Sequence, residues 1–266
     1  MSVEVIHGDC LEVLKALQFP GGARVHTITD PPYSETVHKN AMTGRWKREL
    51  PDTEEHECRK ARRIEFGFDA LTKETRDAIA AWHADRCNGW LVVFSDSESS
   101  HLWRSSCESV GLDYVRTAAW IRRGGAPQFT GDRPAAGFEA ITLCHPKGRK
   151  RWNGGGKAGI YDCPIVANRC GQRGSRLHPT QKPLELMLEL VRDFTNEGDW
   201  IIDPFCGSGT TLVAAQRLGR SAIGIDRLLE HYETARDRVR ADASGSNLQH
   251  YRRGQTTLFD TLKEPA

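Results

Sequence analysis

The chain has 266 residues, of which 38% are hydrophobic and 27% charged, and its formal net charge is +2. This length and composition suit a globular protein with one α/β domain, alone or with a sizeable insert. No apolar run approaches the roughly 18 residues of a membrane span. The N-terminus MSVEVIHGDC has neither the cationic flank nor the apolar core of a signal peptide. We therefore expect a cytoplasmic protein with no membrane partner.

Five short apolar runs indicate buried, parallel strands. They are Val3–His7, Val25–Thr29, Trp90–Phe94, Trp200–Ile202 and Ser221–Ile225.

Helical patterns alternate with these runs. Asp9, followed three residues later by Glu12, resembles a capping box at the start of a first helix. Pro183 opens a second helix with apolar residues at helical spacing. Thr210–Leu218 is typical of a third helix, which Gly219 ends. Alternating strands and helices predict an open, doubly wound α/β sheet.

Three stretches do not fit this alternation. Residues 34–66 are charge-dense, residues 122–177 are rich in glycine and arginine, and residues 243–266 resemble a tail. We interpret the chain as one domain over residues 1–266. It would carry a mobile insert at 34–66, a candidate recognition segment at 122–177 and a tail at 243–266.

The small net charge conceals an asymmetry. Residues 121–182 contain 12 lysines and arginines against 3 acidic residues, so the remainder of the chain is acidic. A basic segment inside an otherwise acidic chain indicates that one face meets a polyanion.

The chain has eight cysteines, and none of them forms a C-x-x-C pair. A four-ligand zinc site normally shows such short spacing. We therefore expect free thiols in a reducing compartment and no metal site.

The tetrapeptide Asp30-Pro31-Pro32-Tyr33, all of it candidate catalytic residues, follows the second predicted strand. Two prolines fix two φ angles and remove two N–H donors, which leaves a stiff turn with free carbonyls. Asp30 and the Pro31 carbonyl can accept the two hydrogens of an exocyclic amino group while Tyr33 stacks on the base. The nitrogen lone pair would then face a methyl donor for direct in-line transfer. The alternative is an ordinary proline turn with a core tyrosine.

A strand, a glycine turn and a helix follow one another at Trp200–Thr211. Glycine lets the backbone turn sharply and approach a ligand, and Asp203 faces the crevice where such sheets bind ligands. Asp226 ends the next strand and can accept hydrogen bonds from ribose hydroxyls. The loop lacks the lysine pattern of a triphosphate site, and the Asp203 carboxylate suits a ligand with an ammonium group. The alternative is that the glycines serve packing alone.

Four motifs, in this order, resemble the DNA amino-methyltransferases acting on N6 of adenine or N4 of cytosine, in their permuted β-type arrangement. They are Gly8-Asp9-Cys10, Asp30–Tyr33, His178-Pro179-Thr180-Gln181-Lys182-Pro183 and Asp203–Thr211. The resemblance runs from residue 1 to about residue 242. It implies a seven-stranded, mostly parallel sheet with helices on both faces, a basic insert for DNA recognition, and S-adenosylmethionine as methyl donor.

The resemblance also implies roles in cofactor binding. The methionine portion would be held by Asp203, Phe205, Cys206, Gly207, Ser208, Gly209 and Thr210. Asp226 would take the ribose. Thr180 and Lys182 would line the methionine end, with a solvated lysine at a helix start as the alternative for Lys182. Asp9 would lie near the cofactor adenine, cap the first helix, or do both.

Duplex DNA is the expected partner, and the target base must leave the stack before its amino group can be reached. Contacts to DNA are expected from Arg45, Lys47, Arg122, Arg123, Lys147, Arg149, Lys150, Arg151, Arg173 and Arg176. Trp152 would wedge or stack among them. The alternative is a solvated basic loop.

Aspartate at the start of the tetrapeptide favours N6 of adenine over N4 of cytosine. The alternatives are N4-cytosine methylation, an RNA or protein substrate, and a non-catalytic DNA-binding module with a vestigial cofactor site. Gln255–Phe259 resembles the short Q-x-x-L-F peptides that dock on bacterial replication clamps, and a tail strand or core anchor is the other interpretation. The sequence leaves open a homodimer, the DNA recognition sequence, an accompanying restriction nuclease, and a bacterial or phage origin.

Overall fold

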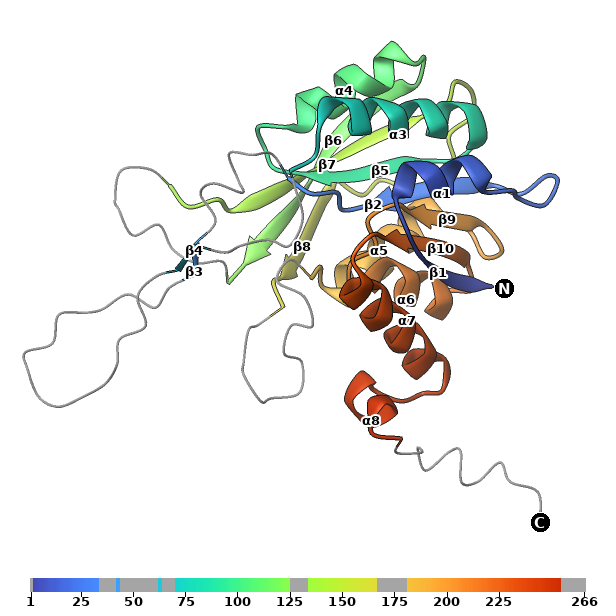
Figure 1. The fold of residues 1–266 in the computed structure, drawn as a ribbon. Coiled ribbons are helices and arrows are strands. Elements are labelled where there is room, and N and C mark those ends of the chain that lie inside the picture. The colour runs from blue at the N-terminus through green and yellow to red at the C-terminus, as the bar shows by residue number, and fades with distance from the viewer. Residues whose placement is uncertain are drawn as a thin grey trace, which may run out of the picture.

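The computed structural model describes residues 2–33, 42–43, 62–63, 70–124, 134–166 and 181–254. Within these residues the fold is built on an eight-stranded sheet with helices on both faces (Figure 1). In spatial order its strands are β1 (Val3–His7), β10 (Ser221–Asp226), β9 (Trp200–Asp203), β2 (Val25–Thr29), β5 (Leu91–Ser95), β7 (Phe138–His145), β6 (Asp113–Arg123) and β8 (Ile160–Pro164). A separate antiparallel pair joins β3 (Met42–Thr43) to β4 (Arg62–Arg63).

The sheet is mostly parallel. The first five strands in spatial order run in one direction. Only β7 runs against its two neighbours, and β8 is parallel to β6. The predicted doubly wound, mostly parallel sheet is therefore confirmed. It has eight strands in place of the seven that the family resemblance implies, because β8 adds a strand at the edge beyond β6.

All five predicted strands exist, and β5 is displaced by one residue from its predicted position. The strands β6, β7 and β8 were not predicted, and β7 and β8 lie in the glycine- and arginine-rich segment. Seven of the eight β7 residues are buried. Polar residues such as Glu139, Thr142 and His145 interrupt the apolar run by which a buried strand is recognised. Both β7 and β8 lie inside residues 122–177, so the described part of that segment contributes two strands to the central sheet.

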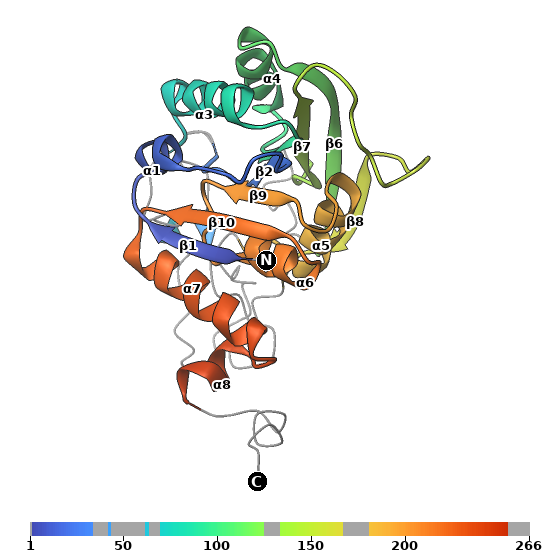
Figure 2. The ribbon, with the colours of Figure 1, turned by 90° about the vertical axis from the view of Figure 1, so that its right-hand side faces the viewer.

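Two layers of helices enclose the sheet (Figure 2). One face carries α1 (Cys10–Ala16), α3 (Lys73–Arg86) and α4 (Ser100–Ser109), and the other carries α5 (Leu184–Phe194), α6 (Thr210–Arg217) and α7 (Leu229–Ala243). Successive strand residues point to opposite faces. In β5, Leu91 and Val93 pack into the core on the α1, α3 and α4 face, whereas Val92 and Phe94 pack into the core on the α5, α6 and α7 face. All four are fully buried, as expected for a parallel strand covered on both faces.

The predicted start of α1 is confirmed. The Asp9 carboxylate accepts hydrogen bonds from the backbone N–H groups of Leu11 at 2.9 Å and Glu12 at 3.2 Å. Glu12 does not return the bond of a capping box, because its carboxylate pairs with Lys15 at 2.7 Å. Asp9 therefore caps the helix at the edge of the sheet where the parallel strands end.

The C-terminal helices also follow the sequence signals. The α5 helix begins directly after Pro183, and α6 ends at Arg217, two residues before the positive-φ Gly219. The first part of the predicted tail is helical, since α8 covers Leu248–Arg252. The clamp-like peptide Gln255–Phe259 lies outside the described residues.

The strands β2 and β9 meet where the strand order reverses. The chain runs outward from β2 to β5, whereas β9 and β10 return to lie between β1 and β2. The register pairs Val25 with Trp200 and Thr27 with Ile202, so both strands end at the same level. Asp30 and Asp203 therefore lie at a topological switch point, where doubly wound sheets bind ligands.

None of the helices in the described part of the chain is long and apolar enough to cross a bilayer. The six cysteines among these residues are all free and buried.

Candidate active site

A cavity of about 410 Å³ opens at the carboxyl ends of β2, β9 and β10, and its volume is typical of small-molecule sites. Its walls bring together motifs that are far apart in the sequence. The predicted catalytic and cofactor residues that line it are Asp9, Asp30, Pro31, Pro32, Tyr33, Lys182, Asp203, Phe205, Cys206, Gly207, Ser208, Thr210 and Asp226. The diproline turn and the glycine loop thus share one cleft, as the sequence predicts.

The two loop glycines have different tasks. Gly207 lines the cavity at φ +49°, and a Cβ added there would meet no atom within 4 Å. Gly209 has φ +76°, and a Cβ there would lie 3.0 Å from the Ala235 Cβ on α7. Gly207 therefore keeps the loop backbone open to a ligand, whereas Gly209 lets the loop pack against a helix.

Asp203 is a buried carboxylate on the cavity wall. Its Oδ1 accepts hydrogen bonds from Thr29 Oγ1 at 2.8 Å and from the Phe205 backbone N–H at 3.2 Å. Burial nevertheless raises the pKa of Asp203 to about 6. Burial also raises the pKa of the neighbouring Cys206 thiol well above its usual range, so this cysteine is protonated and not nucleophilic.

Asp226 ties the glycine loop to the end of β10. Its Oδ2 accepts the Gly207 backbone N–H at 3.0 Å, and its Oδ1 accepts the Leu228 backbone N–H at 2.9 Å. The His231 ring lies 3.4 Å from Oδ1. Each carboxylate oxygen can accept a second hydrogen bond, so Asp226 can still receive ligand hydroxyls.

The two carboxylate oxygens of Asp30 differ in their hydrogen-bond partners. Lys182 Nζ donates to Oδ2 at 2.5 Å. Oδ1 is buried and has no hydrogen-bond partner within the described part of the chain. Burial raises the pKa of Asp30, although the Lys182 ammonium acts in the opposite direction. One oxygen is therefore fixed by the protein, and the other is left for a donor that a ligand brings.

Tyr33 is held by its hydroxyl group. The hydroxyl donates to Glu139 Oε2 at 2.5 Å and accepts from Lys182 Nζ at 3.2 Å. Burial, followed by the Asp30 and Glu139 charges, raises the pKa of Tyr33 well above its usual range. The ring is therefore a neutral, oriented surface on the cavity wall.

Lys182 lies at the diproline turn. Its side chain is 7% exposed, which excludes the solvated lysine considered from the sequence. Its Nζ lies 2.5 Å from Asp30 Oδ2 and 3.1 Å from Glu139 Oε2, and 4.9 Å from the centre of the Phe94 ring. The structure thus places Lys182 against the tetrapeptide, whereas the resemblance assigned it to the methionine end of the cofactor.

Glu139, Arg238 and Gly224 are among the residues that shape the site and were not predicted from the sequence. Glu139 contacts both Tyr33 and Lys182 from β7. Arg238 on α7 donates to the Ser208 carbonyl at 3.1 Å and so holds the loop from behind. Gly224 on β10 leaves room for the loop, because a Cβ there would lie 2.8 Å from the Cys206 Cβ. A glycine within an apolar strand was the one local signal available.

Two arginines predicted to contact DNA lie at the end of β6. Arg122 lines the cavity, and its Nε lies 3.4 Å from Glu139 Oε1. Arg123 pairs with Asp162 at 2.7 Å on the exposed side. Arg122 is therefore part of the cavity wall.

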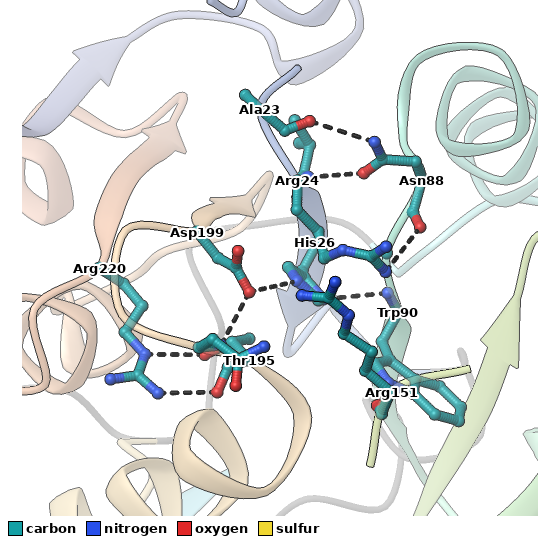
Figure 3. A network of polar contacts seen from close by, with 12 residues as sticks. Ala23, Arg24, His26, Asn88, Trp90, Arg151, Thr195, Asp199 and Arg220 are labelled. Carbon is teal, nitrogen blue, oxygen red and sulfur yellow. Dashed lines mark hydrogen bonds and ion pairs between the residues drawn. The ribbon is translucent and has the colours of Figure 1, made fainter. Parts of the chain in front are cut away.

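The basic run Lys147, Arg149, Lys150 and Arg151 does not line the cavity. Because β7 is antiparallel to β5, it ends beside the start of that strand, at the edge of the sheet opposite the cavity. Arg151 lies there beside Trp90 and His26 (Figure 3), and its carbonyl accepts the Trp90 indole N–H at 2.5 Å. Lys150 pairs with Asp113 at 2.8 Å.

Trp152 does not line the cavity. Its ring packs on Phe194 at 5.1 Å, and its indole N–H donates to the Gly155 carbonyl at 2.8 Å. These contacts anchor a loop to the end of α5.

The remaining predicted residues lie outside the described residues. They are Arg45, Lys47, Arg173, Arg176 and Thr180.

A doubly wound sheet whose carboxyl edge joins a glycine loop, two acidic strand ends and a proline-fixed acceptor defines the methyltransferase class of α/β proteins. The chain belongs to the DNA methylase family of the N6/N4 type, whose family model matches residues 25–237.

Individual relatives agree with this assignment. The Type II methyltransferase M2.DpnII of Streptococcus pneumoniae is 54% identical over 65 residues, which cover 24% of this chain and 24% of that protein. The chain thus matches about a quarter of the length of this curated relative.

Solved structures show the fold. The M1.HpyAVI–SAM complex has a TM-score of 0.62 and 22% identity over 88% of this chain and 97% of that one. The cytosine-N4-specific PvuII DNA methyltransferase has a TM-score of 0.64 and 15% identity over 96% and 94% of the two chains.

Proposed function

We propose that this protein is an S-adenosylmethionine-dependent DNA methyltransferase that methylates N6 of an adenine rotated out of duplex DNA. Membership of the DNA methylase family supports the reaction class. The observation that carries the proposal is Asp30 Oδ1, a buried acceptor without a partner in the described part of the chain, on a residue that lines the cavity. Such an acceptor is costly unless a ligand supplies a donor, and an exocyclic amino group does so.

The same cavity fits the proposed cofactor. When bound, S-adenosylmethionine supplies a methyl group on a positively charged sulfur. The Asp203 carboxylate and the open backbone at Gly207 suit its charged methionine portion, and Asp226 has acceptor capacity left for its ribose. The Asp203 and Asp226 carboxylates on this part of the wall favour a cationic ligand over a phosphate.

The side chain of Asp30 and the backbone carbonyl of Pro31 would then orient the target amine. Asp30 Oδ1 accepts one N–H, and the Pro31 carbonyl accepts the other. Tyr33 stacks on the base with its hydroxyl group fixed by Glu139. With both hydrogens held, the nitrogen lone pair faces the methyl group. The N–C bond would form as the S–C bond of the donor breaks and leaves a neutral thioether, while the negative charge of Asp30 stabilises the positive charge that develops on nitrogen. One of the two held hydrogens would then leave as a proton through Asp30 Oδ1 to solvent.

The choice between adenine and cytosine as the methylated base needs a separate argument. Cytosine presents an equivalent amino group, and a cytosine-N4-specific enzyme has the same fold at a TM-score of 0.64. Fold alone therefore does not select the base. We favour adenine because the turn begins with Asp30, whereas relatives that act on cytosine more often have serine there. N4 of cytosine is the second candidate.

The proposal is tested with the full chain, radiolabelled S-adenosylmethionine and unmethylated duplex DNA, followed by digestion to nucleosides. We expect the label in N6-methyladenine. Label in N4-methylcytosine would establish the second candidate. A protein that binds the cofactor yet labels no DNA base would overturn the proposed activity.

The setting is also a proposal. A curated relative is a Type II methyltransferase of Streptococcus pneumoniae, which supports the proposal that this chain acts in a bacterial cell. Single-molecule sequencing of DNA from expressing cells would give the recognition sequence. Methylation confined to RNA or protein would contradict this setting.

A further inference from the structure

Glu139 is a second carboxylate of the catalytic centre, and neither the motifs nor the family assignment gives it a role. It lies on β7, lines the cavity and is 7% exposed. Its Oε2 accepts the Tyr33 hydroxyl at 2.5 Å and lies 3.1 Å from Lys182 Nζ. Its Oε1 lies 3.4 Å from Arg122 Nε. A buried carboxylate with three such contacts is fully engaged with the site.

Lys182 is shared between two carboxylates as a result. Its ammonium lies 2.5 Å from Asp30 and 3.1 Å from Glu139. Were Asp30 its sole counter-ion, the two charges would cancel where the amine must be held. With Glu139 present, the Lys182 charge is divided between two carboxylates, and Arg122 faces Glu139 Oε1 at 3.4 Å. Lys182 then neutralises less of the Asp30 charge, which favours the positive charge moving from sulfur to nitrogen.

We propose that Glu139 is a positioning residue for methyl transfer: it orients the Tyr33 ring and shares Lys182, so that Lys182 does not neutralise Asp30 alone and Asp30 directs Oδ1 at the amine. This inference rests on the proposed function. It assigns Glu139 no contact with the reacting atoms, because its contacts are to Tyr33, Lys182 and Arg122.

The pH dependence of the reaction separates this role from simple support of the fold. Four groups face Asp30: Lys182 before α5, Glu139 on β7, Tyr33 in its own turn and Asp203 on β9. The Glu139 charge raises the pKa of Asp30, and the Lys182 charge lowers it. Removing the Glu139 charge therefore lowers the pKa of Asp30, and the acid limb of the pH–rate profile moves to lower pH.

The chain offers a matched control. Asp193 on α5 is also a buried carboxylate that accepts a tyrosine hydroxyl, Tyr161 at 3.0 Å, and a lysine ammonium, Lys157 at 2.6 Å. It does not line the cavity. Asp193→Asn thus removes the same kind of charge from the same kind of triad away from the reaction.

The experiment measures single-turnover methylation of duplex DNA from about pH 5 to about pH 9. For Glu139→Gln we expect a rate about 10- to 100-fold lower near pH 8, cofactor affinity within about twofold of wild type, and an acid limb at lower pH. Asp193→Asn should keep the wild-type limb and rate in whatever fraction folds. A wild-type rate and limb for Glu139→Gln, or an equal effect of Asp193→Asn, would overturn the inference.

A second variant covers the case in which Glu139→Gln does not fold. Glu139→Asp keeps the charge but withdraws it by one methylene, so we expect a lower rate with the acid limb unmoved. A shifted limb in this variant would count against the shared lysine. If wild-type protein methylates no base, the proposed function fails instead, so the two failures are distinct.

Discussion

Thr29 Oγ1 donates a hydrogen bond to Asp203 Oδ1 across 2.8 Å. Thr29 ends β2 directly before the diproline turn, and Asp203 ends β9 directly before the glycine loop. Both side chains are buried. This one contact therefore joins the half of the site that would hold the amine to the half that would hold the methyl donor.

The burial of Asp203 predicts a stability that falls with rising pH. Its pKa is raised from 3.8 to about 6 in the folded protein, so the folded state holds the proton more tightly than the unfolded chain. The stabilising contribution is complete below about pH 4 and is lost as pH rises through about 6, by about 3 kcal/mol. Asp203→Asn should therefore stabilise the cofactor-free protein at pH 8 more than at pH 4, and should lose cofactor binding.

Urea denaturation without cofactor at the two pH values measures this difference, with calorimetry for the binding. If Asp203→Asn raised the unfolding free energy equally at both pH values, the pKa of Asp203 would not be raised in the folded state.

Asp30→Ala should abolish methyl transfer and leave cofactor binding intact. In the described part of the chain Asp30 pairs with Lys182, which does not belong to the glycine loop, so removal of the Asp30 side chain should leave the loop unchanged. We expect a loss of at least about 100-fold in the single-turnover rate. Calorimetric titration with S-adenosylmethionine gives the affinity of the same sample. If a folded variant lost both properties together, the separation of roles between turn and loop would be wrong.

Local patterns predicted the parts of the site that lie next to one another in the sequence. The tetrapeptide follows an apolar strand, and the glycine loop joins a strand to a helix, so both could be assigned to strand ends. Their meeting in one cleft follows from the rule that ligands bind at the carboxyl edge of a parallel sheet.

Contacts that depend on pairing between distant strands could not be predicted. Glu139 reaches Tyr33 because β7 runs antiparallel beside β5, and no local pattern marks that pairing. The same reversal takes Lys147 and Arg149 away from the cavity. Charge composition indicated a polyanion-binding face but carried no information on where the chain would place it.

Gly207→Ala and Gly209→Ala should fail in opposite ways. An alanine at position 209 would bring a Cβ to 3.0 Å from Ala235 at a φ of +76°, so we expect a loss of about 2 kcal/mol in unfolding free energy. An alanine at position 207 meets no atom within 4 Å but enters the cavity. It should cost about 1 kcal/mol from its φ of +49° and weaken cofactor binding more than tenfold.

Thermal melts and calorimetric titration of both variants give the two quantities side by side. Similar losses of stability and affinity in both would refute the distinction between a ligand-facing and a helix-facing glycine.

The basic run at the edge opposite the cavity predicts that its charge is dispensable for catalysis. Lys147 and Arg149 are exposed there, beyond the end of β7. DNA held at the cavity would meet other cations, and its affinity should still fall steeply with salt. We therefore expect the double substitution Lys147→Glu, Arg149→Glu to leave methylation and DNA affinity within about twofold of wild type, since surface charges beyond about 10 Å are screened.

Arg122→Glu, inside the cavity, should lower the methylation rate sharply. Fluorescence anisotropy with duplex DNA at two salt concentrations, run beside the methylation assay, compares the variants. A large loss of affinity in the double variant would mean that DNA wraps to the far edge of the sheet, and the basic run would regain the role that its composition indicates.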